Sequence, residues 1–222
     1  MPQQDFRKQR AAGIAYIAVG AGVAITLWFA IPHLLPPLAG LATPGARMLF
    51  TLKCWAVAVL FSLVLGVEAV THERLSSPAF DPLAGFETRR MRINQRYLQN
   101  TLEQTVVFTA ALFGLAAYCA DGAAMRSVVA ASLVWTIARI AFWAGYHHSA
   151  AARGLGAPGM ALSMILLVYV GARFGGEVAG RPGAIAVVAA FLAIEAFLFW
   201  ATSRRTDDAA ATDAVAPGQR RP

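Results

Sequence analysis

The stretch RYLQNTLE, residues 96–103, stands where a basic, polar connection turns into an apolar run that continues to Cys119. Within it Arg96, Asn100 and Glu103 follow the spacing i, i+4, i+7, so on a helix their side chains share one stripe. With a rise of about 1.5 Å per residue, Glu103 would lie about 10 Å inside the apolar run. A carboxylate at that depth is costly unless it is paired or used, so the stretch predicts a functional site on a membrane-spanning helix.

The composition of the whole chain is that of an integral membrane protein. Of its 222 residues 58% are hydrophobic and only 14% are charged, and the mean hydropathy is +0.55. Soluble domains carry about a quarter of their residues as charges. The net charge of +7 comes mostly from arginine. We do not expect a nucleic-acid partner, because the basic residues are scattered between apolar runs and no reading motif accompanies them.

The pattern predicts an all-α, polytopic bundle of about six membrane spans. The expected spans are 11–31, about 47–70, about 97–119, about 124–149, about 157–172 and about 183–201. Clusters of proline and glycine, or the pair Asp121-Gly122, separate them. The tail, residues 203–222, has no periodicity and is expected to be disordered.

Six spans place both chain ends on one side of the membrane. The N-terminus, the 71–96 connection, the loop around Arg153 and the tail share that side and hold most of the positive charge. By the positive-inside rule we expect this side, and the start of the 97–119 span, to face the cytoplasm. The Ala- and Arg-rich composition leads us to expect a bacterial inner membrane.

A second stripe lies on the fourth span, where Arg139, Trp143 and Tyr146 also follow i, i+4, i+7. The third and fourth spans are consecutive and joined by a tight turn, so they should pack antiparallel. Arg139 lies seven residues inward from Tyr146, and Glu103 lies seven residues inward from Arg96. The two charges are therefore predicted at similar depth.

Two interpretations of these charges stay open. Glu103 and Arg139 could form a structural ion pair that lets two helices carry charges through lipid. Alternatively, they could belong to a ligand pocket, because Arg92, Arg96 and Arg153 add positive charge at the same end without enough nearby acids. Such a pocket suits a small anionic ligand that also carries one ammonium group.

Two motifs resemble those of the MAPEG family in order and spacing: Arg96-x-x-x-Asn100-x-x-Glu103, and the segment from Arg139 to Gly145-Tyr146 with Arg153 seven residues later. LKCW at 52–55 and AFDP at 79–82 fit as well. This family includes microsomal glutathione transferases, leukotriene-C synthase and membrane prostaglandin E synthase. The resemblance covers residues 47–175, which would form a four-helix core. An extra helix and loop (1–46), an extra helix (176–202) and the tail (203–222) would flank it.

The resemblance implies a homotrimer that binds glutathione, as co-substrate, in clefts between subunits. Arg96, Asn100, Glu103, Arg139 and Tyr146 match positions that hold the tripeptide, with Glu103 meeting its γ-glutamyl ammonium and the arginines its carboxylates. Arg153 matches the catalytic arginine that stabilises the glutathione thiolate. A guanidinium lowers the pKa of an adjacent thiol from about 8.5 and so raises its thiolate fraction. The thiolate would attack a lipophilic electrophile, which makes a transferase or peroxidase the favoured activity.

Three positions depart from the family pattern. Gln104 and Val106 follow Glu103 where the family often has a tyrosine and, a few residues on, a proline, and Phe142 replaces a second tyrosine. A non-catalytic MAPEG-like protein that binds a lipid or a partner helix through the same cleft is therefore the alternative. A transporter is a more distant alternative, kept open by Glu195 in the sixth span.

The histidines give no sign of a metal site. His147 and His148 are adjacent, so on a helix their side chains point about 100° apart, and no HExxH motif accompanies them. We therefore predict no metal site.

Overall fold

The computed structural model describes residues 3–215, with side chains for residues 5–203, and it contains helices and no strand over that range. The chain divides into two compact units, Met1–Leu167 and Val168–Pro222. The all-α class predicted from the sequence is confirmed. Each unit is described by itself below.

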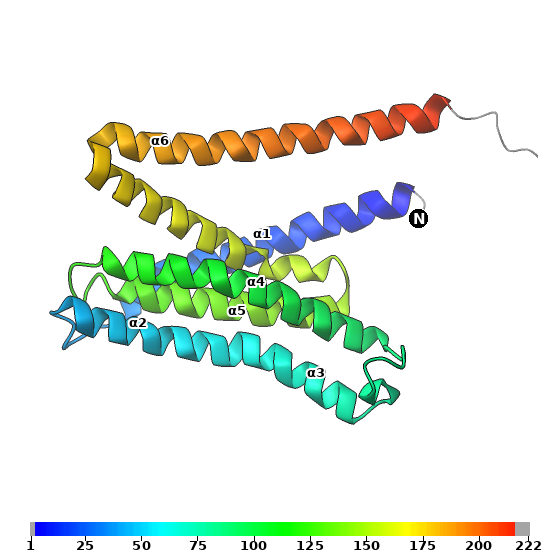
Figure 1. Cartoon of the computed structure of the whole chain (residues 1–222), viewed down its shortest axis with the longest axis horizontal. Coiled ribbons are helices and arrows are strands. Elements are labelled where there is room, and N and C mark those ends of the chain that lie inside the picture. The colour runs from blue at the N-terminus through cyan, green and yellow to red at the C-terminus, as the bar shows by residue number, and fades with distance from the viewer. Residues whose placement is uncertain (1–2, 216–222) are drawn as a thin grey trace, which may run out of the picture. The chain divides into compact units, whose positions relative to one another are not determined.

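The helical elements follow one another with short connections (Figure 1). In chain order they are α1 (Gln3–Leu34), α2 (Pro44–Val59), the π-helix η1 (Leu60–Val64), α3 (Leu65–Leu75), the 3₁₀-helix η2 (Pro78–Phe80), α4 (Arg89–Ala117), α5 (Arg126–His148), the 3₁₀-helix η3 (Ala152–Gly156) and α6 (Ala157–Val215). The first unit holds the elements before α6 together with the first part of α6, as far as Leu167.

Two helix starts in the first unit are capped by threonine. The Thr43 hydroxyl accepts a hydrogen bond from the Ala46 amide at the start of α2, and Pro44 occupies the first helical position. The Thr88 hydroxyl accepts from the Met91 amide at the start of α4. Each cap satisfies one amide that has no partner inside its helix. The second cap fixes where α4, the helix with the RYLQNTLE stretch, begins.

The core of the first unit lies between α2, α4 and α5. Phe108 of α4 stacks on Trp135 of α5 with ring centroids 4.3 Å apart, and Trp55 of α2 donates its indole N–H to the Thr109 hydroxyl at 2.8 Å. Trp135 is fully buried. Its position in the middle of α5, facing α4, makes it a core residue of the bundle.

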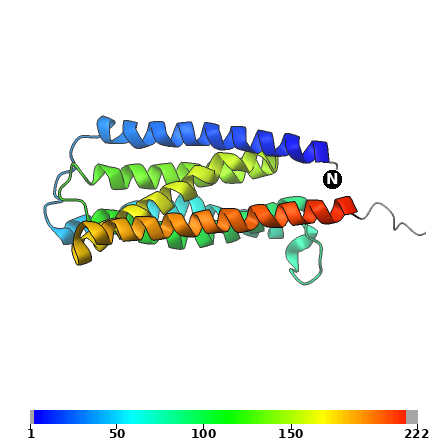
Figure 2. The same ribbon diagram turned by 90° about the horizontal axis from the view of Figure 1, so that it is seen from above.

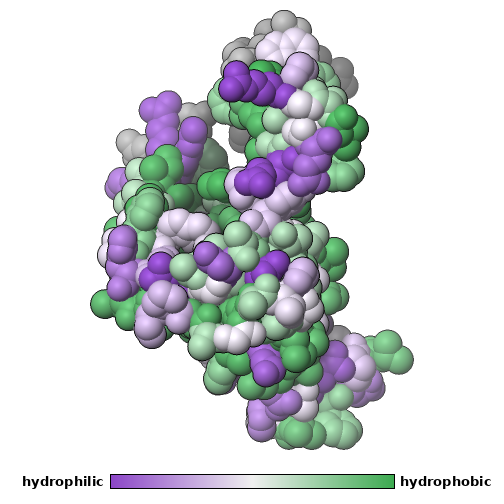
Figure 3. All heavy atoms as spheres, turned by 90° about the vertical axis from the view of Figure 1, so that its left-hand side faces the viewer, coloured by the Kyte–Doolittle hydropathy of each residue, from purple (hydrophilic) through white to green (hydrophobic). Residues whose placement is uncertain are grey.

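Large apolar side chains also cover the outside of the bundle. On the α2–η1 face, about half of each side chain is exposed at Leu52 (46%), Val57 (52%) and Phe61 (54%). Figure 3 looks onto the end of the molecule that carries the 118–125 turn, where hydrophilic residues lie among apolar ones. An exterior this apolar suits contact with lipid, as expected for an integral membrane protein.

Four helices are long and apolar enough to cross a membrane by length and composition: Asp5–Leu34, Pro44–Leu75, Arg126–His148 and Ala152–Ser203. The last of these contains two of the predicted spans, 157–172 and 183–201. The predicted third span, 97–119, falls almost entirely in α4, which is not among the four. Its apolar character is reduced by the polar residues of its first half, and these are the residues predicted to form the site.

Within the first unit, the chain segments predicted to share one side do lie at one end of the bundle. The start of α1, the 76–88 connection and the 149–156 segment are at the right of Figure 1, and the 118–125 turn is at the opposite end. At that opposite end Arg126 donates to the Leu35 carbonyl at 3.0 Å, and Arg47 to the Ala120 carbonyl at 3.0 Å. The helices α4 and α5 are antiparallel, as expected.

The second unit is a helical hairpin within α6. The helix breaks at Ala179 and Gly180, and Gly180 has φ +62°, a conformation that glycine adopts readily. The two arms then approach so closely that a Cβ added to Gly175 would lie 2.6 Å from the Gly183 carbonyl oxygen. The second arm continues to Val215, so residues 203–215 of the tail expected to be disordered are helical, in keeping with their alanine content. Residues 216–222 lie outside the described part.

Candidate active site

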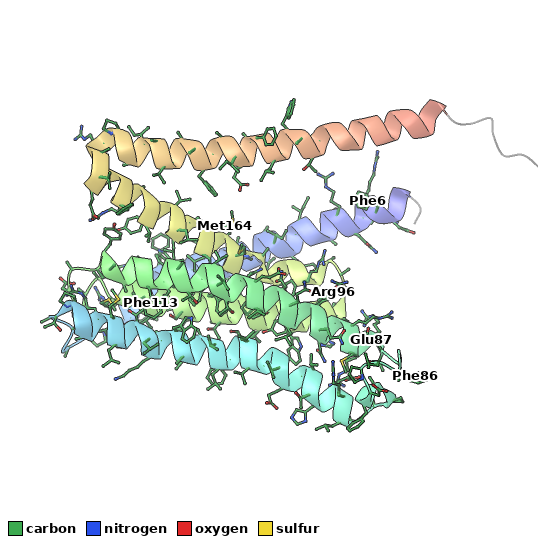
Figure 4. The ribbon with its side chains drawn as sticks, in the orientation of Figure 1. Phe6, Phe86, Glu87, Arg96, Phe113 and Met164 are labelled. Atoms are coloured by element: carbon green, nitrogen blue, oxygen red, sulfur yellow. The ribbon has the colours of Figure 1, made fainter. Side chains whose placement is uncertain are left out.

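Five of the six predicted site residues line one cavity of about 220 Å³ at the end of the bundle that carries the 76–88 connection. Its lining consists of Arg96, Gln99, Asn100, Glu103, Phe142, Tyr146 and Arg153. The first four come from α4, the next two from α5, and Arg153 from η3. Figure 4 shows Arg96 on the half of α4 that leads to Glu87. Helical spacing alone brings the α4 residues together, and the antiparallel packing of α5 supplies the opposite wall.

The sixth predicted residue, Arg139, lies beneath this cavity and is completely buried. Its guanidinium Nη1 donates to the Asn100 side-chain oxygen at 3.2 Å and also to the Gln104 side-chain oxygen. Among residues 5–203, whose side chains are described, no ion pair joins Arg139 to Glu103. The structural ion pair considered from the sequence is therefore absent among these residues, and two neutral amides accept from Nη1 instead.

Two further nitrogens of Arg139, Nε and Nη2, are buried without a hydrogen-bond partner in the described part of the chain. The Phe142 ring covers the guanidinium, with its centroid 4.5 Å from the central carbon. A cation with neutral acceptors and an aromatic face keeps its positive charge uncompensated. The base of the cavity is therefore electropositive.

The acidic and basic groups at the rim are exposed. Glu103 accepts a hydrogen bond from the Gln99 amide at 3.3 Å and forms no ion pair within the described residues. Arg153 lies with its guanidinium carbon 5.6 Å from the Tyr146 ring centroid, and Tyr146 in turn packs at 5.7 Å from Phe142. The α4 wall thus offers the Glu103 carboxylate together with the Arg96 guanidinium, and the opposite wall offers the Arg153 guanidinium and the Tyr146 phenol.

The model of one protein family matches residues 49–175 of this chain, which is more than half of it; its description is MAPEG family. The chain belongs to the MAPEG family. No curated protein and no solved structure matches it. The resemblance inferred from the motifs is therefore confirmed. Membership of this family indicates an integral membrane protein with a role, at the level of the family, of the glutathione-transferase or eicosanoid-metabolism type.

Gln104 belongs to this MAPEG site although sequence reasoning did not assign it, as is also true of Gln99 and Phe142 in the cavity lining. It appears in the sequence only as a departure from the family pattern, but its side chain holds two of the site residues. Its amide nitrogen donates to the Asn100 oxygen at 3.1 Å, and its oxygen accepts from Arg139. The spacing i, i+4 between Asn100 and Gln104 could have indicated the first contact. The second depends on the rotation of α5, for which the sequence carries no direct signal.

Behind the site, two buried residues of α4 fix that helix against its neighbours. The Tyr97 hydroxyl donates to the Ser62 carbonyl at 2.9 Å, in the π-helix η1, and a Cβ added to Gly66 would come within 3.0 Å of the Tyr97 ring. The Asn94 side-chain oxygen is within 3.0 Å of the Trp143 indole nitrogen and 2.9 Å of His147 Nε2. In this MAPEG protein, His147 therefore belongs to a hydrogen-bonded contact between α4 and α5.

Proposed function

We propose that this protein is a membrane glutathione-dependent transferase or peroxidase that acts on lipophilic electrophiles. The observation that carries the proposal is the single cavity lined by Arg96, Asn100, Glu103, Tyr146 and Arg153, with Arg139 bonded to Asn100 beneath it. Glutathione carries two carboxylates, one ammonium and a thiol. A pocket with one carboxylate and several guanidinium groups has the complementary charges.

The proposed binding mode assigns one role to each charged group. Glu103 meets the γ-glutamyl ammonium, since it is exposed in the cavity and forms no ion pair within the described residues. Arg96 meets a carboxylate, Arg139 adds its positive charge from beneath the cavity and is bonded to Asn100, and Asn100 and Tyr146 supply further hydrogen bonds. The uncompensated charge of Arg139 supports this assignment, because a buried guanidinium with two unpartnered N–H groups favours an anion nearby.

Arg153 is the proposed catalytic residue. Its guanidinium would stabilise the glutathione thiolate, whose sulfur then forms a bond to the electrophilic carbon. In a substitution the leaving group departs with the bonding electrons. In an addition the electron pair of the bond that breaks moves to the neighbouring atom, which takes up a proton. With a hydroperoxide, the thiolate attacks the terminal oxygen, the O–O bond breaks, and the alkoxide that leaves takes up a proton to become an alcohol. A second glutathione then reacts with the glutathione sulfenic acid to give the disulfide and water. Arg153 contributes a fixed positive charge to each of these steps.

We propose further that residues 47–175 form the catalytic core of a homotrimer, flanked by the helices of 1–46 and 176–202. The cavity of one subunit is open, which leaves room for a neighbouring subunit to complete it. The basic segments at this end of the bundle favour a site that faces the cytoplasm, and a bacterial inner membrane is the proposed location. A lipophilic substrate would reach the cavity from the surrounding lipid.

Titration calorimetry with glutathione and the detergent-purified protein tests the proposal. We expect binding to the wild type and at least tenfold weaker binding to Glu103→Gln, because the amide cannot pair with the ammonium. Glu87→Gln is the matched control, since Glu87 lies outside the cavity lining. The proposal fails if the wild type does not bind millimolar glutathione, or if both variants bind equally well.

A second candidate is a non-catalytic MAPEG protein that binds a lipid or a partner helix through the same cavity. Phe142 favours it, because this ring brings no hydroxyl to the cavity. Gln104 favours it too, since its side chain is already bonded to Asn100 and Arg139. Absence of turnover with a panel of electrophiles, together with retained trimer assembly, would support this candidate.

A further inference from the structure

The helix α1 lies outside the segment that the MAPEG model matches, residues 49–175, and yet it packs on the element that carries Arg153. It runs alongside α5 in the first unit, and η3 packs against both helices (Figure 2). Since η3 is a 3₁₀-helix of only five residues, its own hydrogen bonds fix it weakly. The position of Arg153 therefore depends on what η3 is packed against.

On the α1 side the contacts are between backbones. A Cβ added to Gly20 would lie 2.4 Å from the Leu155 carbonyl oxygen. A Cβ added to Gly154 would lie 2.9 Å from the Gly13 carbonyl oxygen and 3.1 Å from Ile17 Cγ1. Approaches this close leave no space for even a methyl group without a shift of the backbone. The α1 helix and the residues that directly follow Arg153 are therefore in tight contact.

On the opposite side η3 is equally confined by α5. A Cβ added to Gly145 would meet the Ala152 carbonyl oxygen at 2.3 Å, and one added to Gly156 would meet Phe142 Cβ at 2.3 Å. Ala152 itself is buried. The residues on both sides of Arg153 are thus held between two helices, while its side chain alone extends outward to the Tyr146 ring and the cavity.

We propose that α1 is a brace that holds η3 against α5 and thereby positions the Arg153 guanidinium over the cavity. Gly20 and Ile17 are its positioning residues. The role assigned to Arg153 rests on the proposed function, whereas the packing of η3 does not. A displacement of about 1 Å at a reacting group can lower a rate by as much as about 100-fold. Loosening the brace should therefore affect catalysis from outside the catalytic core.

The chain offers a matched pair of variants on α1. Gly20→Ala introduces a methyl group at the 2.4 Å contact, whereas Gly22→Ala introduces the same group where nothing lies within 4 Å. Both changes raise helix propensity equally, so the pair isolates the contact with η3. Hydrogen exchange of the 149–156 amides in the detergent-purified full chain reports on the brace itself. Steady-state kinetics with glutathione and a chlorodinitrobenzene report on its consequence.

We expect faster exchange over 149–156 in Gly20→Ala only, together with a kcat about 10- to 100-fold lower and a KM for glutathione within about twofold. The pH profile of kcat should move to higher pH, because a displaced guanidinium stabilises the thiolate less. A purely structural role would not move that profile. The proposal is overturned if Gly20→Ala matches Gly22→Ala in both exchange and kcat.

The brace can still be tested if the wild type is inactive or if Gly20→Ala does not fold. If the wild type neither binds glutathione nor turns over, the proposed function fails, and the exchange comparison alone decides whether α1 braces η3. If Gly20→Ala does not fold, Ile17→Ala takes its place, with Ile14→Ala as the control deletion on the same helix. Ile17 contacts the Gly154 position, and faster 149–156 exchange in Ile17→Ala alone supports the brace. Equal exchange in the two isoleucine variants contradicts it.

Discussion

The Arg139 guanidinium donates through Nη1 to the side-chain oxygen of Gln104, joining α5 to α4 directly beneath the cavity. Both residues also bond to the Asn100 oxygen, so the three side chains form a closed set. The set has a net charge of +1, because its two acceptors are neutral amides. It therefore connects the packing of the two helices with the electropositive base of the site.

Removal of the Gln104 acceptor should destabilise the protein. In Gln104→Leu the buried Arg139 keeps one acceptor, Asn100, and a buried charged donor that loses a partner costs about 2–3 kcal/mol. We expect the free energy of unfolding to fall by about that amount in denaturant titrations in detergent. Gln99→Leu is the control, since Gln99 is exposed and should change stability by less than about 0.5 kcal/mol. Equal stability of the two variants would show that the Gln104 bond contributes little.

Replacement of Arg153 should remove turnover and leave the assembly intact. Arg153 is exposed and has no hydrogen bond or ion pair to the other described residues, so Arg153→Leu should not disturb folding. Loss of a charge that stabilises the thiolate should lower kcat by about 100- to 1000-fold. Kinetics and size-exclusion chromatography measure the two effects. Arg89→Leu, an exposed arginine at the same end but outside the cavity lining, should retain activity. Activity that survives in Arg153→Leu would exclude the proposed role.

Most of the site could be predicted from helical spacing. Arg96, Asn100 and Glu103 share a face because their spacing matches the period of any α-helix, whatever surrounds it. Arg139 and Tyr146 come to the same place because a short turn forces α5 to run antiparallel to α4. Depth along the helices predicts Arg139 near the level of Glu103, and in the structure Arg139 bonds to Asn100 and Gln104 on the same helix as Glu103. Rotation of α5 about its own axis decides the partner, and periodicity does not determine that rotation.

Other features depend on contacts that no local pattern encodes. The π-helix η1 in the middle of the second span offers the Ser62 carbonyl to Tyr97, and its sequence, LFSLV, reads as ordinary apolar helix. Proline and glycine between the fifth and sixth predicted spans indicate a break in α6, and the structure has it at Ala179 and Gly180. The brace between α1 and η3 joins residues more than 130 positions apart, beyond the reach of any spacing argument.

The Tyr97 hydroxyl should contribute to stability through its bond to η1. Tyr97 is fully buried, and in Tyr97→Phe the Ser62 carbonyl loses its donor, which should cost about 1–2 kcal/mol of unfolding free energy. Thermal unfolding in detergent measures the loss. Tyr16→Phe on α1 is the control, because the described part of the chain offers its hydroxyl no hydrogen bond, and it should unfold like the wild type. If Tyr97→Phe matches it, the bond to η1 is not a stabilising contact.

Phe142→Tyr should strengthen glutathione binding. The Phe142 ring lines the cavity and packs against the Arg139 guanidinium and the rings of Tyr97 and Tyr146, at distances of 4.5 to 6.1 Å from its centroid. The substitution keeps this ring in place and adds one hydroxyl group. One new hydrogen bond of about 1 kcal/mol would lower the Kd for glutathione about fivefold. Calorimetry on Phe142→Tyr and on the control Phe113→Tyr, which lies outside the cavity lining, measures the difference. A gain confined to Phe142→Tyr would place the tripeptide beside this ring, and no gain would favour the non-catalytic alternative.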